Sequence, residues 1–375
     1  MPRCAAPPRP LRTPTRRSLA CLLGLVSLLL VLDGPAAGGH PPGDPAPRTE
    51  AATNPLAGHP WGVYLGPQEQ SWQPWVNATG RRKELLGKIA LRPKSKWFGT
   101  WSGSPAQIGS KVRTYIDNAT RGDPDVLVQM TVFRMVPWEA EVDDRLPTRR
   151  ERRTYKAWID AFAAAVGDDT RAAIVLQPDG PLALEAPHGS LLPSRLIAYA
   201  AARFGGLAHT ATYIDAGASD WPAGRPDLAA TILQRAGVEH VRGFALNATH
   251  YTSTADNIAY GSRVVAELAR RGLPGKHFVV DTAENGRPFE FSDYRGSHPN
   301  NAKVCTTAEE RRCVTLGIPP TTRVADRRWG LSAQRREQAR AHVDGYLWFG
   351  RPWLYMQTDP FSMERALAMA RTTPY

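Results

Sequence analysis

Four short apolar runs in this chain each end in an aspartate or asparagine that turn residues follow at once. The clearest run, residues 172–177, leads through Pro178 into Asp179 and Gly180. The other three runs end at Asp215, Asn247 and Asp281. In parallel α/β architectures the loops after the carboxyl ends of the strands carry the active site. The pattern therefore predicts four polar groups at one mouth, although each alone could instead cap a helix or start a turn.

Strand and helix patterns alternate along the chain, which implies a parallel sheet with right-handed crossovers. Strands are predicted at 60–65, 96–101, 126–132 and 172–177, near 212, 244 and 278, and at 345–350. Apolar residues at steps of three and four predict helices near 155–166, 193–204, 226–236, 254–271, 332–342 and 363–371. Seven or eight such units favour an α/β barrel over an open sheet. Residues 286–320 lack a period and predict a long loop over the mouth.

Residues 1–37 have the features of a secretory signal peptide. Arginines precede an apolar run at 19–32, and Pro35-Ala36-Ala37 is a plausible cleavage site. The apolar run is shorter than the roughly 20 residues of a spanning helix, so we expect no membrane attachment after cleavage. Residues 15–20 also resemble a twin-arginine export signal. We expect a secreted, extracellular protein with a flexible Pro/Gly/Ala-rich lead-in at 38–56 and a single catalytic barrel domain at 57–375.

The mature chain is basic and has two cysteines. Loss of five arginines and one aspartate with the leader lowers the formal charge from +12 to about +8. The arginines are spread over helical stretches such as 149–153, where solvated faces are the usual explanation, and no basic and aromatic module predicts nucleic-acid binding. In an exported protein Cys305 and Cys313 most simply form a disulfide. We expect no cofactor, no metal and a monomer.

Carboxylates, an amide and large aromatic side chains gather at the predicted mouth. The polar members are Asp179, Asp215, Asn247 and Asp359, and the tryptophans are Trp97, Trp101, Trp221, Trp329, Trp348 and Trp353. Indole faces stack on pyranose rings while carboxylates and amides bind hydroxyl groups, so the set indicates a sugar site. The alternative is that the tryptophans are core residues, and we prefer it for Trp158 and Trp348. No phosphate-binding glycine loop, nucleophile elbow or metal cluster is present.

Five segments resemble motifs of glycoside hydrolase family 6, the inverting cellulases, endoglucanases and cellobiohydrolases. Leu176-Gln-Pro-Asp179 is similar to a Glu-Pro-Asp strand end, and Tyr213-Ile-Asp-Ala-Gly-Ala-Ser-Asp-Trp221 to Tyr-x-Asp-Ala-Gly-His-x-x-Trp. The segments 247–251, 281–286 and 316–322 resemble Asn-x-x-Asn-Tyr, Asp-Thr-x-x-Asn-Gly and Leu-Gly-x-x-Pro-Thr-Thr. The matches follow the family's order from about Trp97 to Asp359. Together they are specific, whereas no single one is.

The resemblance implies a distorted, seven-stranded parallel barrel that cleaves β-1,4-glucosidic bonds with inversion. Inversion needs a protonated carboxyl group for the leaving oxygen and a base that activates water on the opposite face. By position, Asp179 corresponds to the family's second aspartate, which helps to keep the acid protonated. Trp97, Trp221 and Asn247 correspond to sugar contacts. Asp215 and Trp353 join them as expected substrate contacts because they belong to the polar and aromatic set at the mouth.

Several positions depart from the family pattern. The family's acid segment, Tyr-x-x-Pro-x-Arg-Asp-Cys, has no aspartate in register here, so we assign the acid to Glu139, with Glu141, Asp143 and Asp144 as alternatives. Asp359 aligns with the family's base only if extra residues are allowed. Further replacements at substrate contacts are Gln177 for glutamate, Ala218 for histidine and Gln357 for glutamate.

Two functions are therefore consistent with the sequence. The first is a secreted hydrolase of cellulose or a related β-glucan, with Glu139, Asp179 and Asp359 as catalytic residues. The second is a carbohydrate-binding protein on the same barrel whose catalytic pair has been lost. The exact polysaccharide and the choice between endo and exo action depend on loop shapes that the sequence does not specify.

Overall fold

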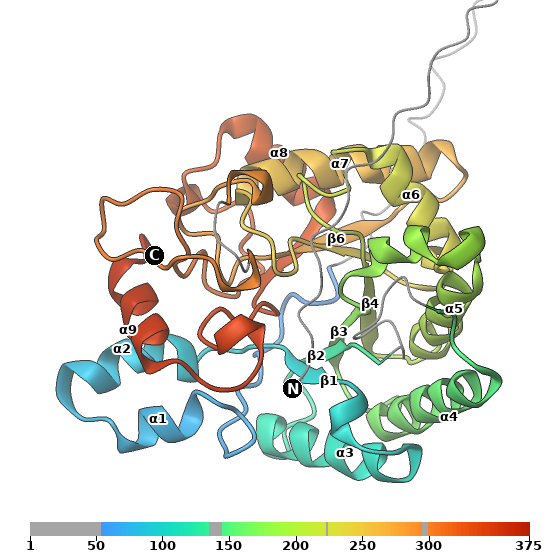
Figure 1. The fold of residues 1–375 in the computed structure, drawn as a ribbon, viewed down its shortest axis with the longest axis horizontal. Helices are drawn as coiled ribbons and strands as arrows, with labels where there is room; N and C mark the ends of the chain where they lie inside the picture. The colour runs from blue at the N-terminus through green and yellow to red at the C-terminus, as the bar shows by residue number, and fades with distance from the viewer. Residues whose placement is uncertain (1–53, 135–144, 223, 295–298) are drawn as a thin grey trace, which may run out of the picture. The chain divides into compact units, whose positions relative to one another are not determined.

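The centre of the protein is one sheet of parallel strands whose spatial order follows their order in the chain (Figure 1). A computed structural model describes residues 54–134, 145–222, 224–294 and 299–375. Within them the sheet has seven strands. They are β1 (Lys96–Phe98), β2 (Val128–Val132), β3 (Ala172–Leu176), β4 (Thr210–Asp215), β5 (Gly243–Leu246), β6 (His277–Asp281) and β7 (Val343–Leu347). Each predicted strand from residue 96 onward is present, whereas the predicted strand at 60–65 is reduced to an isolated bridge between Trp61 and Leu127.

The sheet curls until its two edges meet. Ser95 N donates to Trp348 O at 2.8 Å, and Trp97 Nε1 donates to Phe349 O at 2.6 Å. These bonds join the chain around the start of β1 to the chain just after β7, although no strand ladder links β1 to β7 among the described residues. The predicted distorted parallel barrel is thus confirmed, with an edge-to-edge seam made by loop contacts.

Helices follow the strands around the outside of the curled sheet, from α3 to α8 in chain order (Figure 1). The described helices are α1 (Trp72–Asn77), α2 (Gly80–Ala90), α3 (Pro105–Thr120), α4 (Arg149–Val166), α5 (Leu192–Gly205), α6 (Pro226–Arg235), α7 (Thr254–Arg270), α8 (Ala333–His342) and α9 (Met363–Thr372). Helices α1, α2 and α3 have no counterpart among the predicted helices. A capping box begins α4, because Glu151 accepts from Thr148 N at 2.7 Å and Thr148 accepts from Glu151 N at 3.2 Å.

Alternate residues of each strand supply two different cores. Val175, Tyr213 and Val279 point into the barrel, where Leu56 and Phe349 complete a buried cluster. The intervening residues, such as Ile174 and Ile214, pack against the surrounding helices. This alternation is the ordinary consequence of the two-residue period of a strand in a barrel. Both faces of the sheet are therefore buried, and the site can form only at the strand ends.

Close packing between α7 and β6 makes Gly261 a sensitive position. A Cβ atom at Gly261 would lie 2.5 Å from a ring carbon of Phe278, whereas one at Gly109 in α3 would lie 3.7 Å from the nearest atom, the carbonyl oxygen of Ala161. We expect Gly261→Ala to lower the free energy of unfolding by about 1–3 kcal/mol through overpacking. Gly109→Ala should leave it unchanged or raise it by up to about 1 kcal/mol. Urea titration of both variants measures the difference, and equal midpoints would contradict this packing argument.

The segment 286–320 is irregular, as predicted, over its described residues, which exclude 295–298. It contains short 3-10 turns at Phe291–Asp293 and Pro299–Asn301. Cys305 and Cys313 form a disulfide within it, which confirms the predicted pairing. In the described part of the chain, no helix is both long enough and apolar enough to cross a membrane.

Candidate functional site

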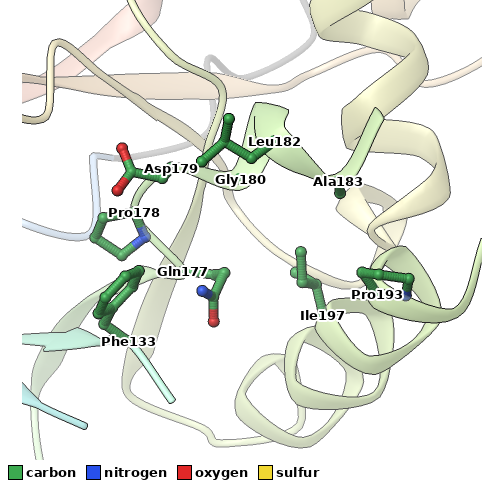
Figure 2. Close-up of a pocket in the computed structure, with 9 residues that line it drawn as sticks. All are labelled: Phe133, Gln177, Pro178, Asp179, Gly180, Leu182, Ala183, Pro193 and Ile197. Atoms are coloured by element: carbon green, nitrogen blue, oxygen red, sulfur yellow. The ribbon is translucent and has the colours of Figure 1, made fainter. Parts of the chain in front are cut away.

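Asp179 lies immediately after β3, on a turn that holds its backbone in the left-handed region at φ 62°. Figure 2 shows it in a pocket with Phe133 from the end of β2 and with Pro193 and Ile197 of α5 on the opposite side of the view. Gly180 is required next, because a Cβ atom there would lie 2.6 Å from Asp215 O. The Asp-Gly sequence therefore lets this turn pass directly over the end of β4.

Two neighbouring aspartates at these strand ends favour their protonated forms. Burial raises the pKa of Asp179, and the charge of His250 offsets part of this effect. Asp215 is fully buried, and burial together with the charge of Asp179 holds the pKa of Asp215 well above its usual range. Gly217 N donates to one Asp215 oxygen at 3.3 Å, while the other oxygen has no hydrogen-bond partner among the described residues. This pair can hold a proton at a pH where an ordinary aspartate is ionised.

Left-handed backbone conformations concentrate in the loops after three of the strands. Outside glycine they include Gln177, Asp179, Asn247, Thr249, Met356 and Gln357, which follow β3, β5 and β7. Such conformations are costly for residues with side chains and gather at functional sites, where the surrounding structure holds them in place. The strained positions therefore mark the same end of the sheet as Asp179.

Asp281, one of the four predicted strand-end groups, forms a second acidic pair with Glu284 under the loop that follows β7, and Glu284 was not among the predicted site residues. Asp281 accepts from Ala283 N at 2.9 Å and also from Gly350 N. Burial raises the pKa of Asp281 to about 7, and burial with the charge of Asp281 holds the pKa of Glu284 well above its usual range. Gln357 Nε2 donates to both Glu284 oxygens, at 3.0 and 2.8 Å. The pair thus ties β6 to the loop that carries Asp359.

We expect Glu284→Gln to stabilise the protein at alkaline pH. A carboxyl group whose pKa is raised by folding supports the fold below its usual pKa of 4.5, and this support is lost as the pH rises. Glutamine keeps the neutral form at every pH, so the melting temperature should rise by about 3 °C or more at pH 8 and should change little at pH 4. The exposed Glu84→Gln variant is the control. A gain that is the same at both pH values would contradict a protonated Glu284.

The aromatic residues of the site do not all present open faces. Trp97 is only 8% exposed, and the Arg351 guanidinium lies 4.3 Å from the centre of its ring. Trp221 is half-buried and stacks on His250 with ring centres 5.5 Å apart. His250 Nδ1 lies 2.9 Å from Asp220 Oδ1, which orients the imidazole. Trp221 thus remains a candidate sugar contact, whereas the ring face of Trp97 under Arg351 is covered.

Besides Trp97, three further expected substrate contacts are buried. Trp353 is 2% exposed and packs against Trp348, with ring centres 6.0 Å apart, so its assignment as a substrate contact is wrong. Asn247 is 1% exposed and donates to Asp281 O at 3.0 Å, a bond that positions the loops. Asp215 is 0% exposed and the charge of Asp179 acts on it, so neither Asp215 nor Asn247 presents its side chain to a sugar in this structure. The buried placement of Trp158 and Trp348 is as predicted.

Of the remaining catalytic candidates, the structure describes Asp359 alone. Asp359 is exposed, and Gln70 Nε2 donates to its Oδ1 at 3.2 Å. Glu139 and its alternatives Glu141, Asp143 and Asp144 fall outside the described residues. The structure therefore brings Asp179 and Asp215 together. Trp221 stacks on His250, whose charge acts on Asp179. In the described residues no group of three or more histidine, cysteine, aspartate or glutamate side chains is arranged to hold a metal ion.

Comparison with known proteins gives one consistent family. The family model described as Glycosyl hydrolases family 6 matches residues 65–329. Endoglucanase A of Cellulomonas fimi is 30% identical over 225 residues, which are 60% of this chain and 47% of that protein. Endoglucanase 1 of Streptomyces halstedii is 31% identical over 239 residues, 60% of this chain and 69% of that protein. The chain thus spans about half of the first relative and about two thirds of the second.

Solved structures of similar fold agree with this match. The endoglucanase Cel6 of Mycobacterium tuberculosis, in complex with methyl-cellobiosyl-4-deoxy-4-thio-β-D-cellobioside, superposes with a TM-score of 0.67 at 25% identity over 85% of this chain and 99% of that one. The catalytic domain of Cellulomonas fimi Cel6B gives 0.56 at 16% identity over 80% of this chain and 81% of that one, which supports the fold alone.

Proposed function

Since the chain belongs to glycosyl hydrolases family 6, we propose that it hydrolyses β-1,4-glucosidic bonds of cellulose or a related β-glucan with inversion at the anomeric carbon. Two relatives similar to this chain are endoglucanases, and one similar structure holds a cello-oligosaccharide analogue. The chain is a secreted protein in this proposal, and it acts as a monomer without a cofactor.

The raised pKa of Asp179 carries the proposal. A general acid must hold its proton until the leaving oxygen needs it, which requires a pKa closer to the working pH than that of an ordinary aspartate. Burial shifts the pKa of Asp179 in this direction, and the buried carboxyl group of Asp215 lies at the adjoining strand end. We therefore assign the acid role to Asp179, where the sequence had predicted a supporting one, and assign Asp215 to the supporting role.

Asp359 is the proposed base. It lies on the loop after β7, and its cationic neighbours are Lys96 and Arg351. An exposed carboxylate in such surroundings is available to take a proton from water. Glu139 and the acidic residues after it lie in the sequence between β2 and α4, outside the described residues, and in this proposal one of them supplies a further carboxyl group to the substrate.

The exposure of Asp359 also favours the second candidate function. A base that activates one water molecule is usually held in place by neighbours, and only the Gln70 hydrogen bond holds Asp359 in the described structure. In this second candidate function the Gln70 hydrogen bond does not hold Asp359 in position to activate water, and the protein binds a β-glucan without cleaving it.

Product analysis separates the two functions. Mature protein would be incubated with soluble β-glucans and cello-oligosaccharides while reducing ends and the anomer of the first product are followed by NMR. Release of α-anomers from β-linked substrates supports the proposed inverting hydrolase. Intact oligosaccharides that nevertheless bind would establish the binding protein, and β-anomers would contradict inversion.

A further inference from the structure

We propose that the site at Asp179 takes a polysaccharide that carries negative charge, and that a cationic pocket on α4 and α5 binds its acidic groups. The cationic pocket consists of Arg149, Arg152, Arg153, Lys156 and Arg195, with Leu192 and Leu196 at its base. Its volume is about 350 Å³. The inference rests on the proposed function, because it names the class of polysaccharide that the Asp179 site binds.

The positive charge of this pocket is uncompensated by the described residues. No acidic side chain lines it, and none of its five cations forms an ion pair with a described residue. The two nearest acids in the sequence are engaged elsewhere: Glu151 pairs with Arg145 at 2.8 Å and Asp160 pairs with Arg203 at 2.8 Å. Nε of Arg152 is buried without a hydrogen-bond partner in the part of the chain that the structure describes. Several cations held together in this way favour an anionic ligand.

The cationic pocket adjoins the Asp179 site through the first turns of α5. Leu192 and Leu196 line the cationic pocket, while Pro193 and Ile197 line the pocket of Asp179 (Figure 2). The two pockets therefore lie against the same helical segment. Because α4 follows β2 and α5 follows β3, both helices begin at the carboxyl ends of the strands, where their dipoles add positive potential. A glycan bound at Asp179 can thus reach the cations with neighbouring sugar units.

A further cation, Arg351, lies near the Asp179 pocket and does not belong to the cationic pocket. Arg351 covers the ring face of Trp97, and Trp97 in turn contacts Phe133 edge to face with ring centres 5.7 Å apart. Phe133 lines the pocket of Asp179. Nε of Arg351 is buried and has no hydrogen-bond partner among the described residues, although the charges of Glu69 and Asp359 act on this guanidinium. Where a neutral sugar would stack on an open indole, this chain presents a cation.

An acidic glycan satisfies these groups better than either a neutral glucan or a nucleic acid. A neutral glucan offers no charge to six cations, so their desolvation would oppose its binding. A single-stranded nucleic acid requires aromatic platforms for its bases. The apolar side chains that line the cationic pocket are instead leucines, and the neighbouring Tyr199 ring is occupied by Lys156, whose Nζ lies 4.6 Å from the ring centre. A β-1,4-linked chain with carboxylates, sulfates or phosphates supplies both the sugar geometry and the charge.

Calorimetric titration of the full chain with matched ligands tests the proposal. The probes are a β-1,4-linked oligoglucuronate, a cello-oligosaccharide of equal length, its sulfated and phosphorylated derivatives, and a single-stranded oligonucleotide. We expect the acidic oligosaccharides to bind at least about tenfold more tightly than the neutral one at low salt, with the advantage falling as salt increases. The most tightly bound derivative identifies the acidic group.

Matched variants separate the cationic pocket from the overall charge. The combined Arg149→Gln, Arg153→Gln and Arg195→Gln variant should lose most of the preference for acidic over neutral oligosaccharides. The control is the combined Arg81→Gln, Arg82→Gln and Arg92→Gln variant, which loses the same charge on and beside α2. The control should keep the preference. Equal affinity for acidic and neutral oligosaccharides, equal losses in both variants, or equally tight binding of the oligonucleotide would overturn the proposal. Cleavage of neutral cello-oligosaccharides without a preference for acidic ones would overturn this inference alone. Selective binding of the acidic ligand without cleavage would instead overturn the proposed hydrolase.

Discussion

The Asp179→Asn variant is expected to lose hydrolysis by a factor of about 10² to 10⁴, because asparagine cannot donate the proton that the leaving oxygen needs. The fold should be retained, since burial already favours the neutral carboxyl group at this position and asparagine has nearly its shape. Initial rates on a soluble β-glucan, measured for protein with an unchanged circular dichroism spectrum and melting temperature, give the effect.

The pH dependence of the same reaction tests the assignment independently. An acid that must be protonated loses activity as the pH rises through its pKa, and burial places this loss for Asp179 above the 3.8 of an ordinary aspartate. The Asp169→Asn variant, at an exposed turn, should keep both the rate and the pH profile. Undiminished rates in Asp179→Asn would assign the acid elsewhere, with the segment 139–144 as the first candidate.

Loss of Asp344 should cause the largest change in stability. This buried aspartate at the start of β7 accepts from Arg242 at 2.8 and 3.0 Å and from the hydroxyl group of Tyr213 at 2.8 Å, and His277 lies 3.3 Å away. Asp344→Ala would leave the half-buried Arg242 without its partner. Breaking such a buried pair costs about 3–5 kcal/mol, which should lower the melting temperature by roughly 10 °C.

The pH dependence of this stability has a definite sign. Burial alone would raise the pKa of Asp344, but Arg242 and His277 lower it below 3.8. A carboxyl group whose pKa is lowered by folding contributes its full stability above its usual pKa and loses that contribution as the pH falls below it. The difference between wild type and Asp344→Ala should therefore be largest near neutral pH and should shrink below about pH 4. Asp169→Ala is the control, and an equal loss in that variant would contradict the special role of the buried pair.

The strand ends could be predicted from sequence because one local rule governs them. An apolar run followed by a turn residue specifies both the strand and the placement of Asp179, Asp215 and Asn247. Helices α1 and α2 gave a weaker signal, since α1 is only six residues long and α2 begins with glycine and three cationic residues. Their apolar residues pack in a separate cluster with α9, which the local pattern does not reveal.

The roles within the site depended on contacts that sequence spacing does not contain. Trp353 and Trp221 are both tryptophans near predicted strand ends, yet one is in the core and the other is half-buried beside His250. The Asp281 and Glu284 pair could have been noticed from its three-residue spacing, but its burial depends on Gly350, where a Cβ atom would lie 2.8 Å from Asp281 Oδ2 and 2.9 Å from Glu284 Oε1. These long-range constraints appear only when the chain is folded.

The seam between β1 and β7 is the place where the barrel opens most easily. Neighbouring strands elsewhere are joined by ladders of backbone hydrogen bonds, whereas the two bonds described above, from Ser95 and Trp97, span the seam. Local opening costs least where the fewest bonds must break. Arg351 after β7 lies on the ring of Trp97 in β1, and Trp97 contacts Phe133, which lines the pocket of Asp179, so a fluctuation that parts the seam also loosens one side of that pocket. A polymer could then enter laterally at any point along its length, without a free end to thread.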